Sequence, residues 1–215
     1  MTEEEARDWL QVNFDVSRET WAQMESYVAL LLDEAERQNL IAASTRESIW
    51  ARHIVDSAQL LLHPRGEGHG ADRPWIDLGA GAGLPGIIVA ILAKCPVILI
   101  ENRKGRIAFL REVTERLALG HAQIVGQKVE ASRLIQPAAV ISARAYAPLP
   151  KLLASAAHLA DKHTQWILPK GRNWQNELDN ARALWQGVFH VEHSVTDPDS
   201  AILVIRDIGK KGRRT

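Results

Sequence analysis

An aspartate followed by closely spaced glycines is the part of this sequence best suited to chemistry. Asp77 precedes Gly79, Gly81, Gly83 and Gly86, and apolar runs lie on both sides of these residues. Glycine adopts positive φ easily and lets a ligand approach bare backbone, and the start of a helix offers free N–H groups. The pattern therefore predicts a ligand-binding turn between a buried strand and a helix.

The glycine turn fits two cofactors. Its last three glycines satisfy the G-x-G-x-x-G pattern of dinucleotide-binding enzymes. Asp77 and the first three glycines instead satisfy the acidic-x-Gly-x-Gly-x-Gly pattern with which class I S-adenosylmethionine (SAM) methyltransferases begin. Glu101, at the end of the next expected strand, suits a ribose diol in either case. A methyltransferase and an NAD-dependent oxidoreductase are both candidates at this point.

Strands and helices alternate around the turn. The runs WIDLGA, PVILIE, AQIVG, AAVISAR and QWILP read as strands, and GIIVAILAK reads as a buried helix. A further helix is expected from Lys104 to Leu117, with Gly120 as its C′ residue. This alternation predicts a doubly wound α/β domain, with helices on both faces of a mostly parallel sheet.

The last two expected strands differ from the others. VFHVEHSV and AILVIRDI are separated only by TDPDS, which is too short for the crossover that joins parallel neighbours. They are expected to form an antiparallel hairpin. Such a hairpin resembles the class I methyltransferase sheet, whereas a dehydrogenase would require another crossover helix, so this feature favours the methyltransferase.

Amphipathic helices precede the sheet. Apolar residues recur at helical spacing from Trp21 to Ala35, and a second helix is expected from about Thr45 to Leu62, with Ser44 or Thr45 as its N-cap. The predicted organisation has three parts. It comprises a helical extension packed on the core (1–62), a SAM-binding methyltransferase domain (63–208) and a disordered basic tail (209–215).

Composition restricts the remaining possibilities. Lysine and arginine total 26, as do aspartate and glutamate, so any polyanionic partner must be met by a local cationic patch. Cys95 is the only cysteine, which excludes an internal disulfide and fits a reducing compartment. His63 and His69 lack the carboxylates or thiolates of a metal site. The acidic start MTEEEARDWL and the absence of a spanning apolar run predict a soluble, cytoplasmic, monomeric protein without membrane contact.

Four ordered motifs resemble one family. RHIVDS, DLGAGAGLPGI, SARAYAPL and LPKG closely resemble the GidB/RsmG family, and the resemblance covers the chain from about Asn39 to Glu177. It implies a methyltransferase that moves a methyl group from SAM to N7 of guanine 527 in 16S ribosomal RNA of the small subunit. A non-catalytic ribosome-assembly factor on the same fold is the main alternative, and an NAD-dependent oxidoreductase is the other.

The resemblance also implies the cofactor contacts. Val129 and Glu130 would flank and hydrogen-bond the adenine, while Arg144 would bind a carboxylate or, alternatively, an RNA phosphate. Leu84 could instead be a core residue, and Glu130 a solvated charge. The candidate cofactor-binding residues are Asp77, Gly79, Gly81, Gly83, Leu84, Glu101, Val129, Glu130 and Arg144.

Cations for RNA are expected at the carboxyl ends of the strands, where ligands of such sheets bind. Arg52 could instead form an i,i+4 ion pair with Asp56, and His53 could be a histidine at the edge of the core. Some tryptophans could stack a base, although most are expected in the core. The candidate RNA-binding residues are Arg52, His53, Arg103, Lys104, Arg106, Lys170 and Arg172; the candidate stacking tryptophans are Trp50, Trp75, Trp166 and Trp174.

The implied nucleophile needs little chemical help. N7 of guanine has a free lone pair and carries no proton, so its attack on the SAM methyl group requires no general base. We therefore predict no catalytic acid or base, and a rate that depends on holding N7 in line with the sulfonium methyl group.

Overall fold

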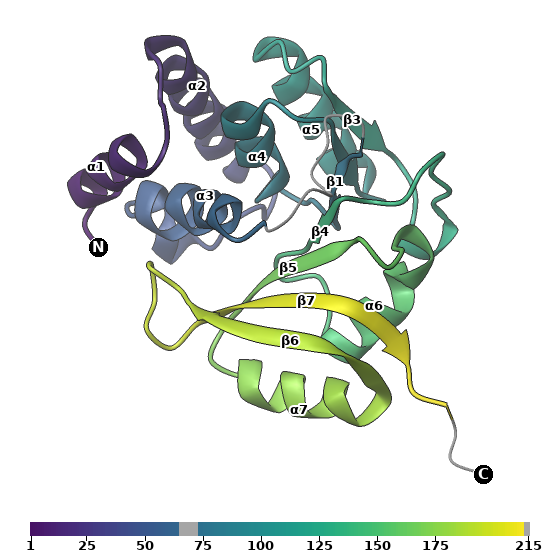
Figure 1. Cartoon of the computed structure of the whole chain (residues 1–215). Helices are drawn as coiled ribbons and strands as arrows, with labels where there is room; N and C mark the ends of the chain where they lie inside the picture. Colours follow the sequence, from purple (N-terminus) through teal and green to yellow (C-terminus); the bar gives the residue numbers. More distant parts are fainter. Residues whose placement is uncertain (65–72, 213–215) are drawn as a thin grey trace.

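A seven-stranded sheet forms the centre of the computed structural model, which describes residues 1–64 and 73–212 (Figure 1). The strand order is β3-β2-β1-β4-β5-β7-β6. The first five strands are parallel, and β7 runs antiparallel to both β5 and β6, so the expected sheet and C-terminal hairpin are confirmed. The strands are β1 (Trp75–Leu78), β2 (Val97–Ile100), β3 (Ala122–Val125), β4 (Val140–Ser142), β5 (Gln165–Lys170), β6 (Trp185–His193) and β7 (Ala201–Lys210).

Helices cover both faces of the sheet, because successive strand residues point to opposite faces and both faces carry apolar side chains. Ile76 and Leu78 belong to one hydrophobic cluster, with α6 and α7, whereas Trp75 belongs to the other, with α4 and α5. The chain runs outward from β1 to β3 and then returns to β4, which opens a crevice at the carboxyl ends of β1 and β4. These helices are α4 (Gly86–Ala93), α5 (Lys104–Arg116), α6 (Leu149–Ala156) and α7 (Trp174–Leu184).

The N-terminal helices pack on the same core as α4. Met24, Tyr27 and Leu31 of α2 (Arg18–Ala35) are fully buried in the cluster that includes α4. Because α2 covers the outer side of α4, that helix is apolar nearly all round. The first helix, α1 (Glu3–Asn13), was not expected from apolar spacing, although its capping box of Thr2 and Glu5 is a signal in the sequence. Figure 1 shows these helices grouped on one side of the sheet.

The expected helix from Thr45 to Leu62 is wrong in its start and its geometry. The chain forms a 3₁₀ turn, η1 (Ala43–Thr45), and then η2 (Trp50–Val55), which is π-helical, followed by α3 (Asp56–Ala58) and η3 (Gln59–Leu62). Neither Ser44 nor Thr45 is the N-cap. The carboxylate of Glu3 instead accepts the N–H groups of Trp50 and Ala51, both at 3.0 Å. A residue from α1 thus caps the helix that carries the RHIVDS motif.

Two further expectations, one about the end of α5 and one about the C-terminal tail, are also wrong. Gly120 is not the C′ residue of α5, because Ala118 takes the positive φ of 53° that follows this helix. The tail is not disordered at its start: β7 continues to Lys210, which pairs with Trp185, and the Lys211 N–H donates to the Leu184 carbonyl. Residues 213–215 and His69 lie outside the described residues. None of the helices in the described ranges is long and apolar enough to cross a membrane.

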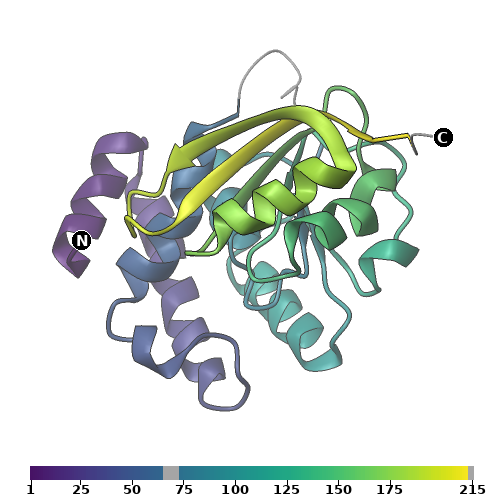
Figure 2. The same ribbon diagram turned by 90° about the horizontal axis from the view of Figure 1, so that it is seen from below.

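The turn between β6 and β7 reaches the N-terminal segment. In Figure 2 this turn lies beside the helices that precede the sheet. Gln59 holds it through two hydrogen bonds, donating to Ser194 Oγ at 3.2 Å and accepting the Val195 N–H at 2.9 Å. Two segments separated by more than 130 residues therefore form one wall at the carboxyl edge of the sheet.

Candidate functional site: two adjoining pockets

The glycine turn after β1 is anchored from behind by Asp77. Its Oδ2 accepts the Gly86 N–H at 3.0 Å, and its Oδ1 accepts the Ser142 hydroxyl at 2.9 Å. Trp75 Nε1 donates to the same hydroxyl at 2.8 Å. Asp77 is completely buried, so it fixes the shape of the turn and lines neither of the pockets described below. Gly79 has the positive φ, 63°, that the sequence predicted for this turn.

Burial raises the pKa of Asp77 to about 7, although its bonds to Gly86 and Ser142 act in the opposite direction. Because the native protein binds this proton more tightly than the unfolded chain, whose value is near 3.8, stability falls as the pH rises from about 4 to 7. Asp77→Asn should remove this component. We expect the difference in unfolding free energy between wild type and variant to change by up to about 4 kcal/mol over that range.

The measurement is urea unfolding at several pH values for wild type, Asp77→Asn and a control, Asp179→Asn. Asp179 is an exposed carboxylate on α7. The control should follow the wild type at every pH. Parallel curves for wild type and Asp77→Asn would show that Asp77 does not change its protonation between pH 4 and pH 7.

A cavity of about 390 Å³ lies over the carboxyl ends of β1, β2 and β3; we call it the cofactor pocket. It brings together Gly79, Glu101, Val129 and Glu130, four of the candidate cofactor-binding residues. Val129 is buried, whereas Glu130 is exposed. The pocket is lined by Gly79, Ile100, Glu101, Asn102, Arg103, Arg106, Gln127, Lys128, Val129, Glu130, Ala145, Tyr146, Ala147 and Lys151.

Glu101, at the carboxyl end of β2, is held in place by backbone N–H groups. Its Oε2 accepts the Gly81 N–H at 3.0 Å, and its Oε1 accepts the N–H groups of Asn102 and Arg103, at 2.7 and 2.9 Å. A carboxylate has about four lone-pair sites, so one remains for a hydroxyl donor, on Oε2, which also lies 3.8 Å from Arg106 Nη1. This oriented negative group fits a ribose diol, and the bare backbone of Gly79 fits a ligand lying close against the turn.

A second cavity of about 560 Å³ adjoins the first; we call it the polar pocket. The two pockets share one wall, Ala145–Ala147, which follows β4. The polar pocket contains charged groups of both signs. It is lined by Thr45, Arg52, His53, Asp56, Arg144, Ala145, Tyr146, Ala147, Pro148, Pro169, Lys170, Gly171, Glu177, Ser194, Thr196, Asp197, Ser200, Ala201 and Ile202.

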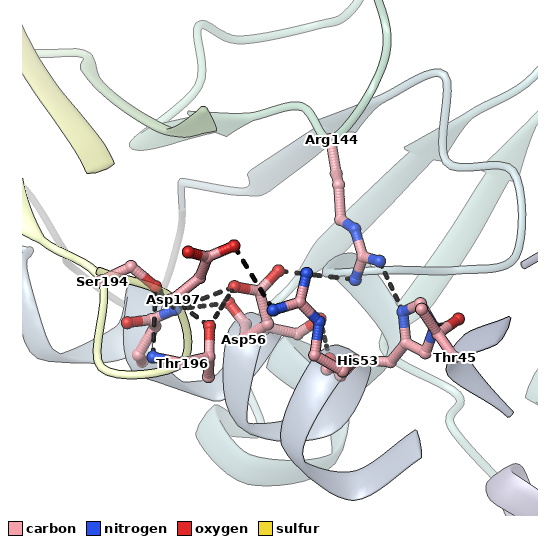
Figure 3. A network of polar contacts seen from close by, with 10 residues as sticks. Thr45, His53, Asp56, Arg144, Ser194, Thr196 and Asp197 are labelled. Carbon is pink, nitrogen blue, oxygen red and sulfur yellow. Dashed lines mark hydrogen bonds and ion pairs between the residues drawn. The ribbon is translucent and has the colours of Figure 1, made fainter. Parts of the chain in front are cut away.

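Arg144 is held by a histidine in a defined neutral form (Figure 3). Arg144 Nη2 donates to His53 Nδ1, and His53 Nε2 lies 2.7 Å from Thr45 Oγ1. Because the Thr45 hydroxyl donates to the Ala42 carbonyl, the proton of His53 belongs on Nε2. Burial, together with the nearby charges of Arg144 and Arg52, lowers the pKa of His53 to about 3. His53 is therefore a neutral acceptor that orients Arg144.

The i,i+4 ion pair between Arg52 and Asp56, the alternative to an RNA contact, does not form. Asp56 Oδ2 lies 3.6 Å from Arg144 Nη1, and Arg52 pairs with Asp197 at 3.4 Å. Thr196 donates to Asp56 Oδ1 at 2.9 Å. Figure 3 shows Asp56 of α3 facing Thr196 and Asp197 of the β6–β7 turn. The pairing is long-range because this turn brings its own carboxylate and hydroxyl to the helix.

A family model described as "GidB: rRNA small subunit methyltransferase G" matches residues 20–200. The chain belongs to this family. It is 50% identical over 202 residues to "Ribosomal RNA small subunit methyltransferase G" of Sphingopyxis alaskensis, covering 94% of this chain and 85% of the relative. It is 48% identical to the protein of the same name from Rhizorhabdus wittichii, over 100% of this chain and 99% of the relative.

Solved structures confirm the class I methyltransferase fold. The glycopeptide N-methyltransferase MtfA in complex with SAM superposes with a TM-score of 0.58 at 9% identity, over 72% of this chain and 93% of MtfA. TYW2 of M. jannaschii in complex with AdoMet gives 0.55 at 13% identity, over 74% and 76% of the two chains. Of the two interpretations of the glycine turn, the family and the fold favour the methyltransferase.

Within this rRNA small subunit methyltransferase G family member, some candidate residues lie away from the expected contacts. Leu84 is buried in the core cluster and lines neither pocket. Arg144 lines the polar pocket and not the cofactor pocket. Lys104 begins α5 and Arg172 is 84% exposed beside Asp199, so both lie outside the pockets.

The tryptophan candidates mostly belong to the core. Trp50, Trp75 and Trp166 are buried, so they cannot stack a base, and Trp174 is half-buried against the second cluster. Two lining residues were not predicted from the sequence: Tyr146, which lines both pockets, and Glu177, which lines the polar pocket. Tyr146 follows Arg144 within the SARAYAPL motif, so its position was a usable signal; Glu177 stands in no motif.

Proposed function

We propose that this protein transfers a methyl group from SAM to N7 of a single guanine, guanine 527, in 16S ribosomal RNA of the small subunit, acting in the cytoplasm as a monomer. Membership of the rRNA small subunit methyltransferase G family supports an rRNA substrate. The observation that carries the proposal is the shared wall of the two pockets, Ala145–Ala147. A cofactor in one pocket and a base in the other meet at this wall.

The cofactor pocket has groups suited to SAM. The carboxylate of Glu101 would accept from the ribose hydroxyls, and Val129 and Glu130 would lie along the adenine. Gly79 lines this pocket with bare backbone, and a side chain there is excluded because its Cβ would lie 2.6 Å from the Tyr146 ring. Bound SAM supplies an electrophilic methyl group.

The protein's own contribution is orientation. N7 of guanine has a lone pair and no proton, so no side chain has to remove one. His53 already accepts from Arg144 and is buried among cations, which makes it a poor base. Holding N7 at the shared wall in line with the methyl group can supply roughly 7–11 kcal/mol of the barrier reduction.

RNA would approach the carboxyl edge of the sheet. Arg103, Lys104 and Arg172 are exposed there, and Arg106 is half-buried. These cations would contact phosphates and give binding that weakens with salt. Because the net charge is zero, this local group and not an overall field would attract the RNA.

The test is transfer of labelled methyl from SAM to small ribosomal subunits that lack the modification, followed by cleavage mapping of N7-methylguanine. We expect label at one guanine in the decoding-site loop, and none on subunits that already carry the modification. A protein that binds the subunits and S-adenosylhomocysteine but transfers no label would be an assembly factor, and the proposed activity would be wrong.

A further inference from the structure

The polar pocket holds an ammonium and a carboxylate side by side. Lys170, the last residue of β5, has only 9% of its side chain exposed, and its ammonium donates to Glu177 Oε2 at 2.8 Å. The same ammonium donates to the Ala147 carbonyl at 3.1 Å. Both side chains line the pocket. A ligand in the pocket therefore meets a fixed hydrogen-bond donor directly beside a fixed acceptor.

Glu177 has acceptor capacity to spare. Oε2 accepts from Lys170 and from the Leu149 N–H at 2.8 Å, but within the described part of the chain Oε1 accepts no hydrogen bond. The other two carboxylates of the pocket, Asp56 and Asp197, use both oxygens in contacts inside the protein. The side chain of Glu177 is 23% exposed, so Oε1 can receive a donor from a ligand.

We propose that Lys170 and Glu177 read the target base, an assignment that rests on the proposed function. The Lys170 ammonium lies next to the shared wall, where it donates to the Ala147 carbonyl, and the Glu177 carboxylate lies beyond it. The edge of guanine has a matching order. N7 must face the wall, O6 follows as an acceptor, and N1–H and the N2 amino group follow as donors. Lys170 donates to O6, and Glu177 accepts from N1–H and N2.

The same pair rejects adenine. Adenine has an amino donor where guanine has O6, and an acceptor where guanine has N1–H. It would therefore place a donor against the ammonium and a lone pair against the carboxylate. A nucleotide extruded from its loop is commonly recognised through this edge. The fixed order of Lys170 and Glu177 thus makes the pocket specific for guanine.

The experiment compares small subunits that carry guanine or inosine at the target position. Inosine keeps N7, O6 and N1–H but lacks the N2 amino group. We expect kcat/KM of the wild type to fall about tenfold with inosine. Glu177→Gln should lose roughly ten- to hundredfold with guanine, and inosine should cause no further loss. Asp179→Asn, which also converts a carboxylate to an amide but at an exposed position of α7, should behave as the wild type.

Folding of the variants is checked by thermal unfolding and by the affinity for S-adenosylhomocysteine. Glutamine can still accept the Leu149 N–H, and Glu177→Asp provides a second version of the comparison. If inosine costs Glu177→Gln as much as it costs the wild type, Glu177 does not contact the base and the assignment is overturned. If the wild type fails to methylate N7 on subunits that carry guanine, the proposed function itself is wrong, and this outcome is seen without the inosine comparison.

Discussion

Gly79→Ala is expected to weaken cofactor binding about 100-fold. The residue has a φ of 63°, where an alanine costs about 1–2 kcal/mol. Its Cβ would also lie 2.6 Å from Cδ2 of Tyr146, whose ring lines both pockets. The ring can make room only by moving and the backbone can relax only by changing the turn, so either response deforms the cofactor pocket. The deformed pocket is expected to cost a similar amount of binding free energy, and the two costs together correspond to the 100-fold loss of affinity.

The measurement is calorimetric titration with SAM and S-adenosylhomocysteine. Gly120→Ala is the matched control, because a Cβ at Gly120 meets no atom of the described residues within 4 Å and this residue is not in the positive-φ region. The control should bind both ligands as the wild type does. Wild-type affinity in Gly79→Ala would show that the ligand does not lie against this turn.

Arg144→Ala is expected to lower kcat/KM for methyl transfer by about 100-fold. The guanidinium bridges His53 and Asp56 at the start of the shared wall. Removing it releases both partners, and a misplacement of about 1 Å at a reacting group can cost a factor of this size. Arg144→Lys should recover little, because one ammonium cannot reproduce the planar fork that faces both groups.

The two interpretations of Arg144 have different signatures. If it binds the SAM carboxylate, the variant should lose affinity for S-adenosylhomocysteine; if it serves the RNA, that affinity should persist while KM for the small subunit rises. Arg116→Ala is the control, since Arg116 lies exposed on α5 and pairs with Glu112 at 2.9 Å, away from both pockets. Full activity of Arg144→Ala would remove this residue from the site.

The parallel strands, the glycine turn and the antiparallel hairpin followed from the sequence because their signals are local. The glycine spacing lies in one continuous stretch, and the shortness of TDPDS decides the direction of β7. Gly79, Glu101, Val129 and Glu130 met in one pocket because parallel strands bring their carboxyl ends together.

The contacts that were not predicted join distant segments. The i,i+4 spacing offers Asp56 as a partner for Arg52, but in the fold Arg52 pairs with Asp197 at 3.4 Å. The cap of η2 comes from Glu3, 47 residues upstream of Trp50, so inspection of residues near Thr45 could not find it. Contacts of this kind depend on how the hairpin and the first helix dock, which periodicity does not encode.

The position of β7 in the chain and in the sheet determines which of the two pockets is completed first during translation. This strand is the seventh in the chain, yet it lies between β5 and β6 and pairs with both. Chains leave the ribosome N-terminal part first, so the glycine turn and the cofactor pocket emerge before β7 can insert. A nascent chain that ends within the β6–β7 turn has every side chain of the cofactor pocket, but lacks Ala201 and Ile202 of the polar pocket. Translation therefore completes the cofactor pocket first and the polar pocket last.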